Sequence, residues 1–205
     1  MTISNNLQKI KEKIKNKLES CSRTDDITIV AATKYANVKQ ITELLDCGIK
    51  VIGENKVKDA IEKFKLIQNF EQVEKHMIGH LQTNKVKKVV ENFDCIQSVD
   101  SIKLAKEIDK HAKNSNKIMQ IMIQLNISRE PQKFGIKPGD AEDFFNQLLK
   151  LKNINVIGLM AIAPNVDKEK TRAYFKEVKK IKEKLKLKHL SMGMSSDYPV
   201  AIEEG

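Results

Sequence analysis

Apolar residues along the chain follow two periods, one typical of strands and one typical of helices. Unbroken apolar and β-branched runs predict strands that are buried on both faces, as in a parallel sheet. Between these runs, apolar residues recur at intervals of three and four positions, which predicts amphipathic helices. The predicted strands span residues 27–33, 49–52, 75–78, 93–99, 118–127, 156–162 and 189–192.

A predicted helix fills each interval between these strands, and further helices lie at both ends of the chain. The first helix has apolar residues at positions 3, 7, 10, 14 and 18, and it precedes the first strand as an extra element. The last, short helix follows the seventh strand and has Pro199 in its first turn. The pattern therefore predicts seven strand–helix units preceded by one additional helix.

This alternation, without repeats, linkers or low-complexity segments, predicts a single α/β domain over residues 1–205 with a parallel sheet. Seven regular units favour a TIM-type (β/α)8 barrel over a doubly wound sheet, which usually has fewer strands. A complete barrel needs an eighth strand, and no apolar run follows the last helix. We therefore expect a barrel with an extra amino-terminal helix that lacks its eighth strand and has open edges at strands one and seven.

Composition is that of an ordinary globular protein, with 40% hydrophobic and 31% charged residues in a chain of 205. The longest apolar stretch, residues 156–163, is too short to cross a membrane, and the polar amino terminus is unlike a signal peptide. We therefore expect a cytoplasmic protein without membrane attachment. The cysteines Cys21, Cys47 and Cys95 have no CxxC spacing, which predicts free thiols and neither disulfides nor a metal site.

A formal net charge of +10 raises the question of nucleic-acid binding. Of the 37 basic residues only three are arginines, however, and the lysines are spread over every predicted helix. Aromatic residues make up 5% of the chain and tryptophan is absent, so bases would have few side chains on which to stack. We expect no nucleic-acid partner.

Candidate ligand-binding residues lie where the predicted strands end, because side chains at the carboxyl ends of barrel strands converge on a ligand. Lys34, Asn55 and His80 follow the first three strands, Met160 lies in the sixth, and residues 191–196 follow the seventh. Taken alone, Lys34 is one lysine among many, and a solvated surface lysine is the simpler interpretation.

The segment from Ser191 to Asp197 is the most informative of these. Gly193 allows the backbone to approach a ligand, and Ser195 and Ser196 add two hydroxyl groups before a helix amino terminus that favours an anion. A serine-rich helix cap beside two core methionines is the alternative. The barrel context favours a phosphate site, because barrels often hold phosphate after strands seven and eight.

A lysine and a phosphate site at one barrel mouth indicate two kinds of chemistry. One is an aldolase-type enzyme, in which Lys34 forms a Schiff base with a phosphorylated sugar. The other is a pyridoxal-phosphate protein, whose lysine forms a Schiff base with the cofactor aldehyde. Either needs a neutral amine, so we expect desolvation or a neighbouring cation to lower the pKa of Lys34 below its ordinary value.

Six short motifs occur in a fixed order along nearly the whole chain. They are ATK (32–34), GEN (53–55), HMIGHLQTNK (76–85), SVD (98–100), GLMA (158–161) and SMGMSSDY (191–198). Each motif is weak alone, but the ordered set resembles the YggS/PROSC family of pyridoxal phosphate homeostasis proteins, which are related to the N-terminal domain of alanine racemase.

The resemblance implies a single barrel that binds pyridoxal 5′-phosphate (PLP) as a Schiff base on Lys34. It also implies that Asn55 lies close to the cofactor. The loop with Gly193, Ser195 and Ser196 would hold the phosphate.

The resemblance further implies that His80 is a wall of the site and that His76 has a structural role at its strand. The family is regarded as a carrier and regulator of PLP without substrate turnover, so no catalytic residue is expected. PLP-dependent apoenzymes would be recipients, and we expect a monomer. The alternative is a PLP-dependent amino-acid racemase or another Schiff-base lysine enzyme, although the related racemases use a second domain that supplies a tyrosine base.

The chain departs from the family pattern at its carboxyl end. Members of the family continue after the glycine that matches Gly205 with a strand containing an Arg-Ile-Gly turn. We therefore expect the 205-residue chain to be truncated there and to bind PLP more weakly, in a titration, than a form extended by that strand.

Overall fold

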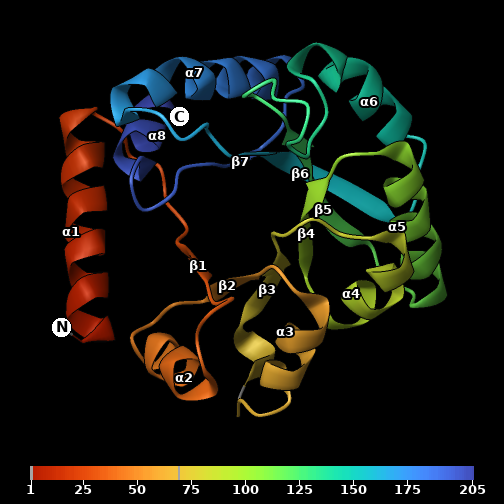
Figure 1. Ribbon diagram of the computed structural model, residues 1–205, viewed down its shortest axis with the longest axis horizontal. Helices are drawn as coiled ribbons and strands as arrows, with labels where there is room; N and C mark the ends of the chain where they lie inside the picture. The colour runs from red at the N-terminus through yellow and green to blue at the C-terminus, as the bar shows by residue number, and fades with distance from the viewer. Residues whose placement is uncertain (1, 69) are drawn as a thin grey trace.

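A curled parallel sheet organises the molecule. The computed structural model describes residues 2–68 and 70–205. Its seven strands form one parallel sheet in the order β1-β2-β3-β4-β5-β6-β7, so each strand pairs with the next along the chain. The strands curl around the centre of the molecule and the helices lie outside them (Figure 1). This arrangement confirms the predicted TIM-type architecture.

The strands lie within a few residues of their predicted positions. They are β1 (Val30–Ala32), β2 (Val51–Glu54), β3 (Glu74–Met77), β4 (Cys95–Val99), β5 (Met119–Leu125), β6 (Ile154–Ala161) and β7 (His189–Ser191). The α-helices are α1 (Ile3–Ser20), α2 (Val38–Asp46), α3 (Val57–Phe64), α4 (Val86–Asn92), α5 (Ile102–Asn114), α6 (Ala141–Leu148), α7 (Lys168–Lys184) and α8 (Tyr198–Glu204). Three short 3-10 helices are η1 (Phe70–Gln72), η2 (Thr83–Lys85) and η3 (Pro138–Asp140).

Strand β1 differs most from its prediction. The apolar run from Ile27 to Thr33 predicts a strand buried on both faces, but only residues 30–32 pair with a neighbour, and Ala32 is exposed. Among the described residues β1 pairs with β2 alone, and residues 24–29 form no backbone–backbone hydrogen bond. A strand with one neighbour keeps one flank open to solvent, so the predicted burial was wrong.

Strand β7 is the other edge of the sheet, because within the described part of the chain it pairs only with β6. Over residues 2–68 and 70–205 the sheet has no eighth strand, and β1 and β7 are not paired with each other. The predicted open edges at strands one and seven are therefore present.

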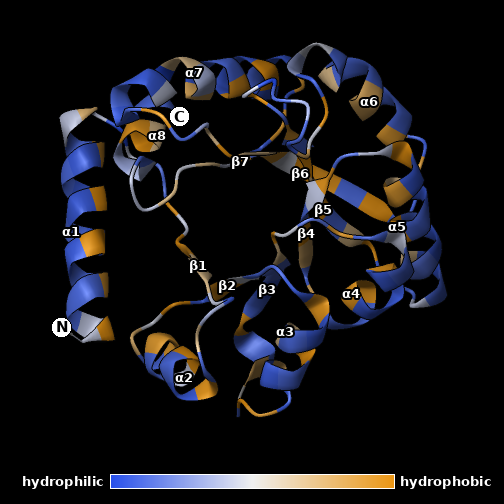
Figure 2. Ribbon diagram, in the orientation of Figure 1, coloured by the Kyte–Doolittle hydropathy of each residue, from blue (hydrophilic) through white to orange (hydrophobic). Residues whose placement is uncertain are grey.

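The main core fills the layer between the sheet and the helices. Ile96 of β4 and Ile121 of β5 belong to one buried cluster with Leu104 of α5 and Phe175 of α7. Helix α1 buries Leu7, and its hydrophobic residues form a stripe on the side that faces the rest of the molecule (Figure 2).

Helix α8 is held between α1 and α7 by charged side chains. Arg172 of α7 donates hydrogen bonds to Glu203 and Glu204, each at 2.5 Å. Lys17 of α1 forms an ion pair with Glu203 from the other side. These contacts fix the helix that follows the loop after β7, and they thereby set the position of that loop.

Candidate functional site

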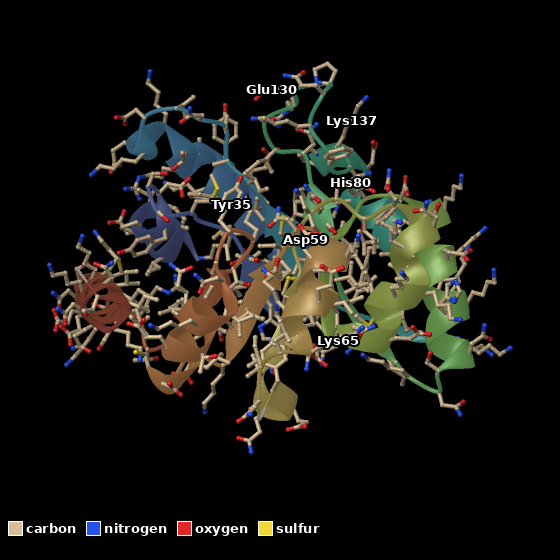
Figure 3. All side chains as sticks on the ribbon, turned by 60° about the horizontal axis from the view of Figure 1, so that its bottom comes forward. Tyr35, Asp59, Lys65, His80, Glu130 and Lys137 are labelled. Atoms are coloured by element: carbon tan, nitrogen blue, oxygen red, sulfur yellow. The ribbon has the colours of Figure 1, made fainter. Side chains whose placement is uncertain are left out.

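The carboxyl ends of the strands lie along one rim of the sheet, because all seven strands are parallel. Figure 3 marks Tyr35, His80 and Glu130, from the connections after β1, β3 and β5, in the upper part of the view. Lys65, which follows α3, lies below them. Lys34, Asn55, His80 and the loop after β7 therefore follow strand ends on a common rim.

Lys34 occupies a turn directly after β1, and it is exposed. The Ala36 N–H donates to the Thr33 carbonyl oxygen at 3.0 Å across this turn. The Lys34 Nζ lies 5.0 Å from the centroid of the Tyr35 ring. It has no carboxylate partner in the part of the chain that the structure describes, so its amino group is available to a ligand.

Thr33, immediately before Lys34, is held by residues of β2 and α3. Its N–H donates to the Gly53 carbonyl oxygen at 2.9 Å, and its Oγ1 donates to Glu54 Oε1 at 2.7 Å. The Lys63 Nζ donates to the Thr33 carbonyl oxygen at 2.8 Å and forms an ion pair with Glu54. This pair was not predicted from the sequence, although a carboxylate at the end of an apolar strand was an available signal.

Asn55, predicted to lie near the ligand, is half-buried at the end of β2. Gly79 after β3 packs against it, since a Cβ on Gly79 would lie 2.5 Å from the Asn55 carbonyl oxygen. The Ile78 N–H donates to the Glu54 carbonyl oxygen at 2.9 Å beside this contact. The ends of β2 and β3 are thus locked together next to Asn55.

The loop after β7 makes a tight turn around Gly193. Gly193 has φ of +86°, and a Cβ there would lie 2.8 Å from the Tyr198 Cα, so a side chain would be both strained and obstructed. The Met194 N–H donates to Asp197 Oδ1 at 2.6 Å, and Asp197 is buried. The aspartate therefore fixes the loop from within.

Ser195 and Ser196 lie at the exposed tip of this loop. Neither their backbone N–H groups nor their hydroxyls have a hydrogen-bond partner among residues 2–68 and 70–205. Successive free N–H groups in a turn form a concave site for an anion. The two residues predicted for phosphate binding therefore present unused donors.

His80 connects the rim after β3 with the loop after β5. Its ring stacks on Phe134 with centroids 3.7 Å apart and an interplanar angle of 11°. Its Nδ1 lies 3.7 Å from Asp100 Oδ2. Burial raises the pKa of Asp100, and the neighbouring His80 and the Gly135 N–H act in the opposite direction.

Met160, predicted among the ligand-binding positions, is a core side chain. It is buried and packs with Cys95 and Met122 in a cluster separate from the main core. Burial raises the pKa of the Cys95 thiol to about 12. The structure thus brings Met160 into the interior packing and not to the exposed rim.

A polar network ties β7 to β3 and β4. The Ser191 Oγ donates to Gln97 Oε1 at 2.6 Å, and Gln97 Nε2 donates to His76 Nδ1 at 2.7 Å. His76 Nε2 lies 3.3 Å from Glu74 Oε2, and burial lowers the pKa of His76. His76 therefore has a structural contact, and the Ser191 hydroxyl is used in the same network.

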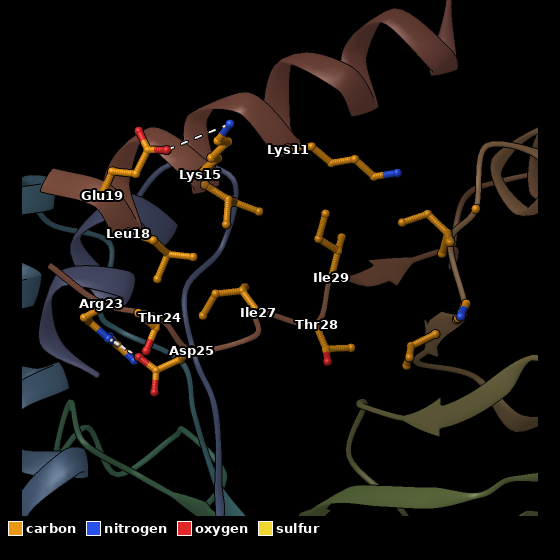
Figure 4. A pocket seen from close by; sticks show the side chains of 15 residues that line it. Lys11, Lys15, Leu18, Glu19, Arg23, Thr24, Asp25, Ile27, Thr28 and Ile29 are labelled. Atoms are coloured by element: carbon orange, nitrogen blue, oxygen red, sulfur yellow. Dashed lines mark hydrogen bonds and ion pairs between the residues drawn. The ribbon is translucent and has the colours of Figure 1, made fainter. Parts of the chain in front are cut away.

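A cavity of about 520 Å³ lies away from this rim, between α1 and the segment that precedes β1 (Figure 4). Four of the charged side chains that line it form pairs, Lys15 with Glu19 at 3.9 Å and Arg23 with Asp25 at 2.6 Å. None of the predicted site residues lines it. Within the described residues, no cluster of three or more His, Cys, Asp or Glu could hold a metal ion, and no helix is long and apolar enough to cross a membrane.

Comparison with known proteins gives one consistent family. The matching family model is described as alanine racemase, N-terminal domain, and it matches residues 2–203. The pyridoxal phosphate homeostasis protein of Aquifex aeolicus is 36% identical over 213 residues, which cover 100% of this chain and 93% of that protein. The protein of the same name from Pasteurella multocida is 34% identical over 218 residues, covering 100% of this chain and 92% of that protein.

Solved structures agree with this result. PipY of Synechococcus elongatus, determined with PLP bound, has a TM-score of 0.81 and 32% identity, with 94% of each chain covered. A protein from Bifidobacterium adolescentis has a TM-score of 0.94 and 28% identity, covering 99% of this chain and 90% of that chain. Alanine racemase of Clostridium difficile has a TM-score of 0.69 at 16% identity and is covered over 52% of its length, which shows a shared fold alone.

Proposed function

Since this chain belongs to the pyridoxal phosphate homeostasis protein family, which has the alanine racemase N-terminal domain, we propose that it binds PLP at the carboxyl ends of its strands. In this proposal Lys34 holds the cofactor covalently. The chain then contributes to PLP homeostasis in the cytoplasm and does not turn over a substrate.

One observation carries the proposal: the rim of the sheet offers a free amine and a set of free donors. When bound, PLP supplies an aldehyde that reacts with an amine and a phosphate that requires hydrogen-bond donors. Lys34 would provide the amine, because it is exposed and has no carboxylate partner in the described chain. Ser195 and Ser196 would provide unused N–H and hydroxyl donors for the phosphate.

The other predicted residues have supporting roles in the proposed site. Gly193 allows the turn that exposes the two serines, because its φ of +86° favours glycine. Asn55 would lie beside the cofactor, at a position that its contact with Gly79 fixes. His80 would form a wall, since its ring is already stacked on Phe134.

Support for a carrier role comes from the relatives. Proteins that match the whole of this chain are named for PLP homeostasis. We propose PLP-dependent apoenzymes as recipients and a monomer as the binding unit.

A titration tests this proposal. Added PLP should give a visible absorption band with the wild-type protein, and the Lys34→Ala variant should lose that band. The Lys39→Ala variant changes another exposed lysine, in α2, and should keep the band. A wild-type protein without the band would contradict the proposal, and racemisation of free L-alanine by the PLP-loaded protein would replace it with the racemase alternative.

A further inference from the structure

A buried ion pair lies directly behind the proposed PLP lysine. Glu54 of β2 and Lys63 of α3 form this pair, and their side chains are 1% and 15% exposed. Removing two charges from water costs free energy, and replacing such a pair with apolar residues is often neutral or stabilising. Stability of the fold is therefore a weak explanation for its presence.

The contacts of the pair converge on one residue, Thr33. Thr33 Oγ1 donates to Glu54 Oε1 at 2.7 Å, while Lys63 Nζ donates to the Thr33 carbonyl oxygen at 2.8 Å. That carbonyl belongs to the peptide bond that joins Thr33 to Lys34. The same oxygen accepts the Ala36 N–H at 3.0 Å, which closes the turn that carries Lys34.

Glu54 also restrains the backbone next to Asn55, the following site residue. Its carbonyl oxygen accepts the Ile78 N–H at 2.9 Å, so its backbone is fixed to β3 just before Asn55. Its second carboxylate oxygen, Oε2, is buried and has no hydrogen-bond partner among the described residues. Lys63, which forms an ion pair with Glu54, supplies the positive charge that balances this buried carboxylate.

The Lys34 side chain itself has no comparable restraint. Its amino group is exposed and its recorded contact is the Tyr35 ring at 5.0 Å. The position of Lys34 is consequently set through its backbone, and the backbone is set from behind by Thr33, Glu54 and Lys63.

We propose that the buried Glu54–Lys63 pair positions Lys34 for covalent attachment of PLP, in which the lysine nitrogen bonds to the aldehyde carbon and the aldehyde oxygen leaves as water. Glu54 and Lys63 are positioning residues, because both act on Lys34 through their contacts with Thr33. The inference rests on the proposed function. It predicts that loss of the pair weakens attachment to Lys34 more than it weakens the rest of the PLP site.

The test compares PLP with pyridoxine 5′-phosphate, which has the same phosphate but an alcohol in place of the aldehyde and cannot attach to a lysine. Lys63→Met removes the donor to the Thr33 carbonyl, and Lys63→Arg retains a charged donor. We expect Lys63→Met to weaken PLP binding on the order of 10-fold, as expected for one hydrogen bond from a charged group, with pyridoxine 5′-phosphate binding unchanged. Lys63→Arg should restore part of the PLP affinity.

A matched control separates positioning from general stability. Lys117 is another partly buried lysine that donates to main-chain carbonyls, those of Val90 and Phe93, far along the chain from Lys34. Lys117→Met should lower the melting temperature and leave PLP attachment unchanged. If Lys63→Met fails to fold, the double variant Glu54→Gln with Lys63→Met removes both charges together and should show the same selective loss.

The outcomes are distinct. An equal loss of affinity for both ligands, or an unchanged PLP affinity in a folded Lys63→Met variant, would overturn the positioning role. Failure of the wild-type protein to attach PLP at Lys34, read from the mass of the borohydride-reduced protein, would overturn the proposed function instead.

Discussion

The backbone of Gly79 lies so close to Asn55 that a Cβ built on Gly79 would be 2.5 Å from the Asn55 carbonyl oxygen. A methyl group at this position must displace the end of β2 or β3. The two strand ends can approach each other because residue 79 has no side chain. The glycine at position 79 therefore sets the position of Asn55, which is proposed to lie beside the cofactor.

Substitution of this glycine is the first prediction. Gly79→Ala should lower the free energy of unfolding by roughly 1–3 kcal/mol, as other overpacked sites do, and should also weaken PLP binding by displacing Asn55. Urea denaturation and PLP titration measure the two effects. Gly139→Ala is the matched control, because no atom lies within 4 Å of a Cβ at Gly139. Equal behaviour of the two variants would contradict the close contact.

Loss of the loop hydroxyls is the second prediction. The double variant Ser195→Ala with Ser196→Ala should bind PLP about 10-fold more weakly, because two donors to an ionised phosphate are removed. Its affinity for pyridoxal, which has no phosphate, should not change. Competition titrations with both ligands measure the difference. Ser115→Ala, which changes another exposed serine, is the control. An equal loss of affinity for pyridoxal in the double variant would show that Ser195 and Ser196 do not contact the phosphate.

The anchoring of α8 gives a pH-dependent prediction. Hydrogen bonds from Lys17 and then from Arg172 hold the pKa of Glu203 below its ordinary value. A carboxyl group with a lowered folded-state pKa adds stability above its unfolded-state pKa, about 4.3 for Glu, and this stability is lost as the pH falls through the folded-state pKa. Arg172→Ala should therefore reduce the free energy of unfolding near neutral pH and have less effect in acid.

The expected loss at neutral pH is about 1 kcal/mol, because the ion pairs are partly exposed but form a network. Chemical denaturation at about pH 7 and near pH 3.5 would measure it, the lower value lying below the ordinary pKa of Glu. Arg129→Ala removes a more exposed pair with Glu177 and should cost less than about 0.5 kcal/mol. An undiminished effect of Arg172→Ala in acid would show that charge pairing with Glu203 is not its cause.

Hydrophobic periodicity was sufficient to predict the fold. Strand β5, for example, was predicted at residues 118–127 and spans Met119–Leu125. A long apolar run between two helical patterns predicts a buried strand of a parallel sheet. The regular alternation of strands and helices then predicts the order of the strands in the sheet. The extent of β1 could not be predicted in the same way, because the burial of a strand depends on whether both of its neighbours are present.

Candidate positions could be predicted at the ends of apolar strands, although no single residue was decisive. Lys34 ends an apolar strand, and Gly193 precedes two serines. The Glu54–Lys63 pair was not predictable, because its meaning depends on α3 packing over the end of β2 and on the contact of both side chains with Thr33. Met160 was placed among the ligand-binding positions because it lies in a predicted strand. Its position in that strand does not reveal that it packs with Cys95 and Met122.

Reductive trapping shows whether PLP attaches to one lysine, Lys34, among the many lysines of the chain. The protein is mixed with PLP, reduced with borohydride and digested, and the modified peptide is identified by mass spectrometry. Lys34 should be modified stoichiometrically, and the Lys34→Ala variant should remain unmodified at the same ratio of PLP to protein. Modification distributed over surface lysines, or equal labelling of the Lys34→Ala variant, would contradict it.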